Sequence, residues 1–309
     1  MDKFIISSTG LSMNYMPHYV AKELGFFEDV DLEVSSSVPT PWTNVLKEID
    51  SGEAHAVEGG IWVPLIYFNR VKNYPAFSTI ASRCPLVLLS REPVPAFSWK
   101  LLEGKKVLIA GGDGASHGLF ILGCAFYSGA DMSKITVVNN FLASTLVELF
   151  QGGFGDIISL QADMAAQLVT SGKGYIMADL TIHGGPVPWS VYYGTREFLE
   201  HPGNLAGRFT LALQKATTWV LDHDAADCEE IIRKNWPKVD VSYAINVINM
   251  FRREGMWTQS VRIDEGILDR WQNFLVYGNV IDAPLPYQSV VDARPYMYAE
   301  QNITGKPRC

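Results

Sequence analysis

The order of apolar and polar positions along the chain predicts short strands that alternate with amphipathic helices. Strand patterns bury alternate positions, whereas helix patterns place apolar residues three and four positions apart. In the first part of the chain, the predicted strands cover residues 3–7, 31–35 and 54–57, and the predicted helices begin at residues 17, 41 and 64. Thr40 is expected to cap the second of these helices, with Pro41 as its first residue. Strands that alternate with helices predict parallel sheets covered on both faces.

The middle of the chain repeats this plan, which indicates two similar α/β units in tandem. Here the predicted strands cover residues 105–110, 134–138 and 156–160, and the predicted helices cover 116–127, 142–150 and a stretch from 162. Beyond an apolar segment at 189–193 the pattern becomes helical, with helices expected at 205–221, 228–235, 243–253 and 266–274. We therefore expect an α/β fold with two lobes.

Composition excludes several classes of partner. The chain has 309 residues with a formal net charge of −8, and no stripe of Lys and Arg appears, so we expect no nucleic-acid partner. No apolar run is long enough to cross a bilayer, so no membrane insertion is expected. The four cysteines are scattered and no metal-ligand spacing occurs, which predicts buried free thiols, no metal site and no cofactor.

The residues Met1 to Ile6 lack the apolar core of a secretory signal. Two localisations are therefore left open. The protein is periplasmic or extracellular if a signal was removed, and cytoplasmic if Met1 is the true start.

Two glycine motifs imitate functional sites without matching them. Gly112, Gly114 and Gly118 follow a strand like a dinucleotide fingerprint, but the last spacing is one residue too long. Residues 114–118 match the G-x-S-x-G pattern of hydrolases. The central Ser116 lies several residues beyond the predicted strand, whereas a nucleophile elbow places its serine at the strand end.

Several motifs in a fixed order resemble a known superfamily. They are residues 21–27 (AKELGFF) with 31–34 (DLEV), 49–56 (IDSGEAHA), 102–107 (LEGKKV) and 197–199 (EFL). The chain resembles the type-2 periplasmic-binding-protein superfamily, in the branch that holds nitrate-, sulfonate- and taurine-binding proteins and thiamine-pyrimidine synthases.

This resemblance implies a two-lobed structure with a hinge and an interlobe cleft. One lobe would hold residues 1–88 and 195–309, and the other 89–194. Two crossing strands near 85–91 and 191–194 would form the hinge. The ligand would then lie at the carboxyl ends of the strands, where open α/β sheets bind their ligands.

The loops that follow the predicted strands are therefore the candidate ligand-binding segments. The candidate residues are Ser12, Asn14, Tyr15, Trp42, Glu58, Gly60, Trp62, Asp113, Ser116, His117, Gln161, Asp163, His183 and Trp189. These loops contain no Lys or Arg but several aromatic residues, which favours a flat, neutral or weakly basic organic ligand over a small inorganic anion. The alternative is that the tryptophans only pack, and that Asp113 and Asp163 only cap helices.

Two functions follow from the resemblance. The first is a solute-binding protein that delivers a small organic molecule to an ABC importer. The alternative is a cytoplasmic, cofactor-independent enzyme of lyase or hydrolase type on the same fold, related to thiamine-pyrimidine synthases and sulfinate desulfinases. In an enzyme, Ser12, Glu58, His117 and His183 would be the candidate catalytic residues. Ser12 stands where the resemblance implies the cysteine of the desulfinases, and no histidine occupies the synthase position near Trp62 and Val63.

Overall fold

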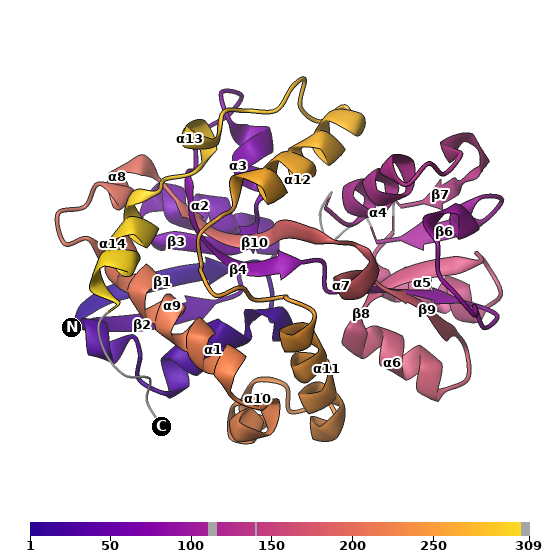
Figure 1. Cartoon of the computed structure of the whole chain (residues 1–309), viewed down its shortest axis with the longest axis horizontal. Coiled ribbons are helices and arrows are strands. Elements are labelled where there is room, and N and C mark those ends of the chain that lie inside the picture. The colour runs from indigo at the N-terminus through magenta and orange to yellow at the C-terminus, as the bar shows by residue number, and fades with distance from the viewer. Residues whose placement is uncertain (111–115, 140, 304–309) are drawn as a thin grey trace. The chain divides into compact units, whose positions relative to one another are not determined.

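A computed structural model describes residues 1–110, 116–139 and 141–303 of the chain (Figure 1). Backbone contacts group these residues into two compact units. The first unit comprises Met1–Ser82, Val187–Leu268 and the chain from Leu285, and the second comprises Arg83–Pro186 and Asp269–Pro284. Relative to the lobes expected from the sequence, residues 83–88, 187–194 and 269–284 are grouped with the other unit. The predicted α/β class is confirmed, because each unit contains one sheet and its own helices.

The first unit is built on a mixed five-stranded sheet with the order β2-β1-β3-β10-β4. The strands are β1 (Asp2–Ser8), β2 (Leu32–Ser37), β3 (Ala56–Gly60), β4 (Ala76–Arg83) and β10 (Pro186–Gly194). The central strand β3 runs parallel to β1 and antiparallel to β10. The end of β1 therefore lies at the same edge of the sheet as the end of β3.

Helices accompany this sheet, and the longest of them buries most of its side chains. They are α1 (Met16–Glu23), α2 (Val45–Ser51), α3 (Trp62–Tyr67), α8 (Arg196–Leu199), α9 (Leu205–Asp222), α10 (Glu229–Asn235), α11 (Val241–Arg253), α13 (Tyr287–Val290) and α14 (Arg294–Asn302). Figure 1 shows α9 beside α1 and α14. The Phe209 ring of α9 stacks on Phe4 with ring centroids 4.6 Å apart, and on Phe27 at 5.2 Å. These buried rings form the centre of the core.

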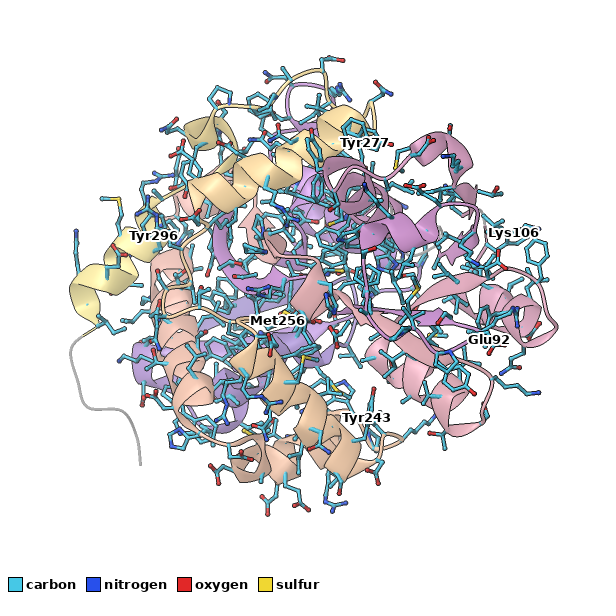
Figure 2. The ribbon with its side chains drawn as sticks, turned by 45° about the vertical axis from the view of Figure 1, so that its right-hand side comes forward. Glu92, Lys106, Tyr243, Met256, Tyr277 and Tyr296 are labelled. Atoms are coloured by element: carbon cyan, nitrogen blue, oxygen red, sulfur yellow. The ribbon has the colours of Figure 1, made fainter. Side chains whose placement is uncertain are left out.

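The second unit has its own mixed five-stranded sheet, ordered β7-β6-β8-β5-β9. Its elements are β5 (Leu86–Ser90), β6 (Lys106–Ile109), α4 (Ser116–Tyr127), β7 (Thr136–Val138), α5 (Ala143–Gln151), β8 (Ile157–Gln161), α6 (Ala162–Thr170), β9 (Tyr175–Asp179) and α7 (Leu180–His183). Figure 2 labels Lys106 at the start of β6, and its ammonium lies 4.3 Å from the centre of the Phe154 ring. An ammonium group over the face of an aromatic ring is attracted by the negative charge of that face.

Helix α12 (Glu265–Tyr277) begins in the first unit and continues in the second. Within the second unit, Arg270 of this helix donates hydrogen bonds to the carbonyl oxygens of Gly184 (2.6 Å) and Pro186 (2.9 Å). Tyr277, labelled in Figure 2, stacks on Phe126 of α4 with centroids 4.2 Å apart. These contacts explain why residues 269–284 belong to the second unit.

Most of the predicted elements are confirmed to within two residues, and helix 116–127 is confirmed at both ends. The predicted helix start at Thr40 and Pro41 is wrong. Pro41 has an extended backbone (φ −68°, ψ 154°), so it cannot be the first residue of a helix, and no side-chain hydrogen bond caps the element that follows. A 3-10 turn, η3 (Trp42–Asn44), intervenes before α2 begins at Val45. Strand β9 was not predicted, because two of its residues, Tyr175 and Ile176, are exposed.

Among the described residues, none of the helices combines the length and the apolar composition that crossing a membrane requires. The described cysteines, Cys84, Cys124 and Cys228, are buried and free, as predicted.

Candidate functional site

Strand register places three polar side chains in one row across the sheet of the first unit. Ser8, the last residue of β1, lies opposite Glu58 of β3, and Glu58 lies opposite Tyr192 of β10. Residues directly opposite each other in adjacent strands point to the same face of a sheet. The Glu58 carboxyl therefore lies between the hydroxyl groups of Ser8 and Tyr192, a set that we call the Glu58 row.

Hydrogen bonds join the members of the Glu58 row. The Tyr192 hydroxyl lies 2.6 Å from Oε1 of Glu58, and the Ser8 hydroxyl lies 2.8 Å from Oε2. Glu58 is only 2% exposed. Burial raises the pKa of Glu58 from 4.5 to about 7, and the hydrogen bonds from Tyr192 and Ser8 oppose this shift. A buried carboxyl that titrates near neutral pH marks a candidate functional site.

His18 of α1 contacts Tyr192, the member of the Glu58 row that lies on β10. Its Nδ1 lies 3.1 Å from the Tyr192 hydroxyl and 4.0 Å from Oε1 of Glu58. The ring is buried, and its Nε2 has no hydrogen-bond partner among the described residues. Burial lowers the pKa of His18 from 6.5 to about 3, with a smaller effect from Lys22. His18 is therefore neutral at physiological pH and forms no ion pair with Glu58.

The turn after β1 holds the predicted residues Ser12, Asn14 and Tyr15. Ser12 donates a hydrogen bond to the side-chain oxygen of Asn14, and the indole of Trp257 donates to the Asn14 carbonyl at 2.9 Å. The Tyr15 hydroxyl lies 3.2 Å from the Ser190 hydroxyl on β10. Burial, and next the Glu58 charge, raise the pKa of Tyr15 to about 12, so this phenol is a neutral hydrogen-bonding group.

Two of the predicted tryptophans form a pair beside the Glu58 row. The ring of Trp62 meets that of Trp42 edge to face, with centroids 6.4 Å apart and an interplanar angle of 79°. Both rings are partly exposed. Gly60, which ends β3 and pairs with Ser190, lies directly beneath Trp62. The first unit therefore brings an aromatic pair and a buried carboxyl to the end of one strand.

We expect that Gly60→Ala displaces the Trp62 ring. A Cβ added at Gly60 would lie 2.4 Å from both Cδ1 and Nε1 of Trp62, which is well inside van der Waals contact. We expect a loss of about 1–3 kcal/mol of stability from overpacking, and a change in the near-ultraviolet circular dichroism of the tryptophans. Gly10→Ala is the matched control, because an added Cβ there meets nothing within 4 Å. Identical spectra and melting temperatures for wild type and Gly60→Ala would refute this packing.

The remaining predicted residues fall in several places. Trp189 is buried on β10 of the first unit. In the second unit, Ser116 and His117 are buried at the start of α4. Gln161 is the N-cap residue of α6 and makes no side-chain capping hydrogen bond. Asp163 lies within the first turn of α6, so the expectation that Asp163 caps this helix is wrong. His183 is exposed at the end of α7 and packs on Phe97 with centroids 5.0 Å apart.

Asp113, together with the glycine turn around it, lies outside the described residues. Within the described part of the chain, no three His, Cys, Asp or Glu side chains come together as a metal site.

Sequence reasoning missed Ser8, His18, Tyr192 and Ser190. His18 lies within an apolar helix pattern and Tyr192 within a strand pattern, so each was indistinguishable from an ordinary core residue. The available signal was the position of Ser8, which ends β1 just as Glu58 approaches the end of β3. Parallel strands that end together bring their last side chains to one edge of the sheet.

Solved structures of binding proteins share the fold of this chain. The structure of the periplasmic aliphatic sulphonate binding protein SsuA from Escherichia coli superposes with a TM-score of 0.70 at 14% identity, covering 96% of this chain and 99% of that one. The ligand-binding component of an ABC-type import system from Staphylococcus aureus, solved with zinc bound, gives a TM-score of 0.72 at 12% identity, covering 97% and 99%. The chain thus has the fold of the periplasmic binding proteins, as the sequence predicted.

Sequence comparison gives the family. The family described as NMT1/THI5 like matches residues 12–226, which is well over half of the chain, and the protein belongs to this family. A relative from Bacillus subtilis strain 168, the candidate binding protein YtlA, is 23% identical over 299 residues, which cover 94% of this chain and 88% of the relative. The predicted superfamily branch is confirmed, and the predicted class of ABC-transporter-type solute-binding protein agrees with these relatives.

The desulfurization enzyme DSZB shares the fold as well. Its structure superposes with a TM-score of 0.65 at 16% identity, covering 97% of this chain and 99% of that one. This likeness shows that one fold serves binding proteins and an enzyme, so the function has to be argued from the site.

Proposed function

We propose that this protein is a solute-binding protein for a small, flat, neutral or weakly basic organic molecule. The observation that carries the proposal is the pair formed by Trp42 and Trp62, placed at the end of β3 beside the buried Glu58. The family match and the shared fold support the binding class. The site residues support the choice of ligand.

The chemistry of the first unit's site favours a flat organic ligand over an inorganic anion. Partly exposed indole rings offer apolar faces for stacking. Anions such as nitrate or sulfonate require a cation or several N–H donors. The Glu58 row and the tryptophan pair include no Lys or Arg, and the carboxyl among them disfavours an anion. The hydroxyl groups of Tyr15 and Ser190 are buried and lie 3.2 Å from each other, so the partly exposed tryptophan pair is the surface that we propose for the ligand.

An ABC importer is the partner that we propose for the loaded protein. The proposal is supported by the Staphylococcus aureus neighbour, which is the ligand-binding component of an ABC-type import system. It predicts that the ligand is released unchanged.

The enzyme alternative is disfavoured by the surroundings of Ser12. A serine becomes a nucleophile when a neighbouring base accepts its proton. The Ser12 hydroxyl instead donates to the amide oxygen of Asn14, which is not a base at physiological pH. We therefore expect Ser12 to position the turn and not to attack a substrate.

We expect flat aromatic probes to quench or shift the fluorescence of Trp42 and Trp62. The measurement is a titration of wild type, Trp42→Phe and Trp62→Phe with nicotinamide, benzimidazole and 4-aminopyrimidine, against ethanesulfonate and nitrate. Removing either tryptophan should weaken binding of an aromatic probe by about tenfold, equal to about 1.4 kcal/mol of stacking. Trp219→Phe is the control, because Trp219 lies on α9 and stacks on His223 with ring centroids 4.0 Å apart. Binding of only the two anions, unaffected by either substitution, would contradict the proposed ligand class.

A further inference from the structure

Four short contacts in the Glu58 row each need one proton. Ser8 Oγ lies 2.9 Å from the Gly10 carbonyl oxygen and 2.8 Å from Glu58 Oε2. Tyr192 lies 2.6 Å from Glu58 Oε1 and 3.1 Å from His18 Nδ1. At such distances two oxygen or nitrogen atoms are held together by a shared hydrogen. A hydroxyl group has only one proton to donate.

If Glu58 is ionised, only three protons are present for the four contacts. Ser8, Tyr192 and the Nδ1 of a neutral His18 supply three protons for the four contacts. If Ser8 donates to an ionised Glu58, the contact between Ser8 and the Gly10 carbonyl has no hydrogen. A protonated Glu58 supplies the fourth proton. His18 then donates to Tyr192, Tyr192 to Oε1 of Glu58, Oε2 of Glu58 to Ser8, and Ser8 to Gly10.

The groups that face Glu58 also favour the neutral acid. From β1 it meets Ser8, from β10 Tyr192, from α1 His18 and Tyr19, and from the turn before α1 Tyr15. The pKa of each of these tyrosines is raised and that of His18 is lowered, so all four rings are uncharged at neutral pH. No cation among these groups compensates a carboxylate, and an uncompensated buried charge is costly.

We infer that Glu58 is a positioning residue that keeps its proton in the folded protein and, through Ser8, holds the Gly10 turn. Two further contacts join the same turn to the network. The Thr9 amide donates to the Glu58 carbonyl oxygen at 3.0 Å, and the Thr9 hydroxyl donates to the same oxygen at 3.3 Å. Loss of the Glu58 proton turns the Ser8 hydroxyl toward the carboxylate and releases the Gly10 carbonyl.

This inference deepens the proposed function and rests on it in one respect, namely that the turn from Thr9 to Ser12 contributes to the ligand site. Binding would then weaken as the pH rises above neutral, because the turn is no longer held. The proton itself can be observed without any ligand, so its test is independent of the ligand class.

The direct test is an infrared pH titration of the ligand-free, full-length protein, with NMR detection of the Gly10 carbonyl carbon. We expect the C=O stretch of a protonated carboxylic acid to be present at about pH 5.5 and lost by about pH 8.5. Glu58→Gln should lack this band, because a glutamine amide is a neutral replacement that donates to Ser8 and accepts from Tyr192. The exposed Glu53→Gln should keep the band and its midpoint.

The Gly10 carbonyl shift should titrate with the same midpoint in wild type and stay constant in Glu58→Gln. Ser8→Ala should keep the infrared band but lose the Gly10 response, since the connecting hydroxyl is gone. Absence of the band from wild type at the lower pH would show an ionised Glu58 and overturn the inference. A titrating band with an unresponsive Gly10 carbonyl would overturn the positioning role. Failure of every probe to bind, with both titrations as expected, would contradict only the proposed function.

Discussion

Wild type is expected to lose about 3 kcal/mol of stability relative to Glu58→Gln as the pH rises from 4.5 to 7. Folding raises the pKa of Glu58 from 4.5 to about 7, because the carboxyl is buried. In this range the folded chain holds a proton that the unfolded chain has released. The contribution is therefore full below the unfolded pKa, and it is lost as the pH rises through the folded pKa, at about 1.4 kcal/mol per pH unit.

His18 contributes with the opposite sign. Its pKa is lowered from 6.5 to about 3, so its contribution is present above pH 6.5 and is lost as the pH falls toward 3. In wild type, the pH dependences that Glu58 and His18 impose on the free energy of unfolding cancel between pH 4.5 and 6.5. Together these two groups therefore leave the stability constant over this range. In Glu58→Gln the His18 slope remains alone, and stability should rise with pH over the same range.

Urea unfolding followed by tryptophan fluorescence at a series of pH values measures both effects. Glu53→Gln is the control, since this exposed side chain of the same unit should leave the wild-type profile unchanged. Parallel profiles for wild type and Glu58→Gln from pH 4.5 to 7 would mean that Glu58 ionises as freely in the folded as in the unfolded chain.

Phe209→Ala is expected to destabilise the first unit by about 3–5 kcal/mol, the range for removing a large aromatic ring from a core. Phe209 is fully buried and stacks on both Phe4 and Phe27. Its ring also meets Tyr192 edge to face at 4.7 Å, so the cavity would loosen the Glu58 row as well. The free energy of unfolding and the infrared band of Glu58 should therefore change together.

Phe209→Leu serves as the control for cavity size, because leucine fills more of the space than alanine. It should lose clearly less stability and retain the Glu58 band. Equal losses for Ala and Leu would argue against a cavity as the cause.

The sequence predicted the elements of each unit better than it predicted their side-chain partners. Helix 116–127 was predicted at both ends because an apolar run stands between a glycine turn and a second glycine, Gly129. The start of α2 was misplaced, because Thr40 and Pro41 satisfy the local preferences for a helix start while the backbone of Pro41 remains extended. Local preference cannot reveal a turn that tertiary packing imposes.

The candidate site was predicted only in part, for a similar reason. Glu58 stood out because it lies between a predicted strand and the pair Gly59-Gly60, and the two tryptophans stood out because they lie in loops that follow predicted strands. Ser8 and Tyr192 become partners of Glu58 only through strand register, across separations of 50 and 134 residues along the chain. The pattern of a single strand carries no information on which residue of another strand lies opposite.

The central claim is that the protein binds a flat organic molecule and releases it unchanged. Equilibrium dialysis of wild type and Trp62→Phe against nicotinamide, benzimidazole and 4-aminopyrimidine, with mass spectrometry of both compartments, tests it most directly. We predict that one of these compounds accumulates on the protein side at up to one equivalent, that Trp62→Phe reduces this excess, and that the compound is recovered chemically intact. Conversion of a probe to a product, or an excess that is the same for wild type and Trp62→Phe, would contradict the account.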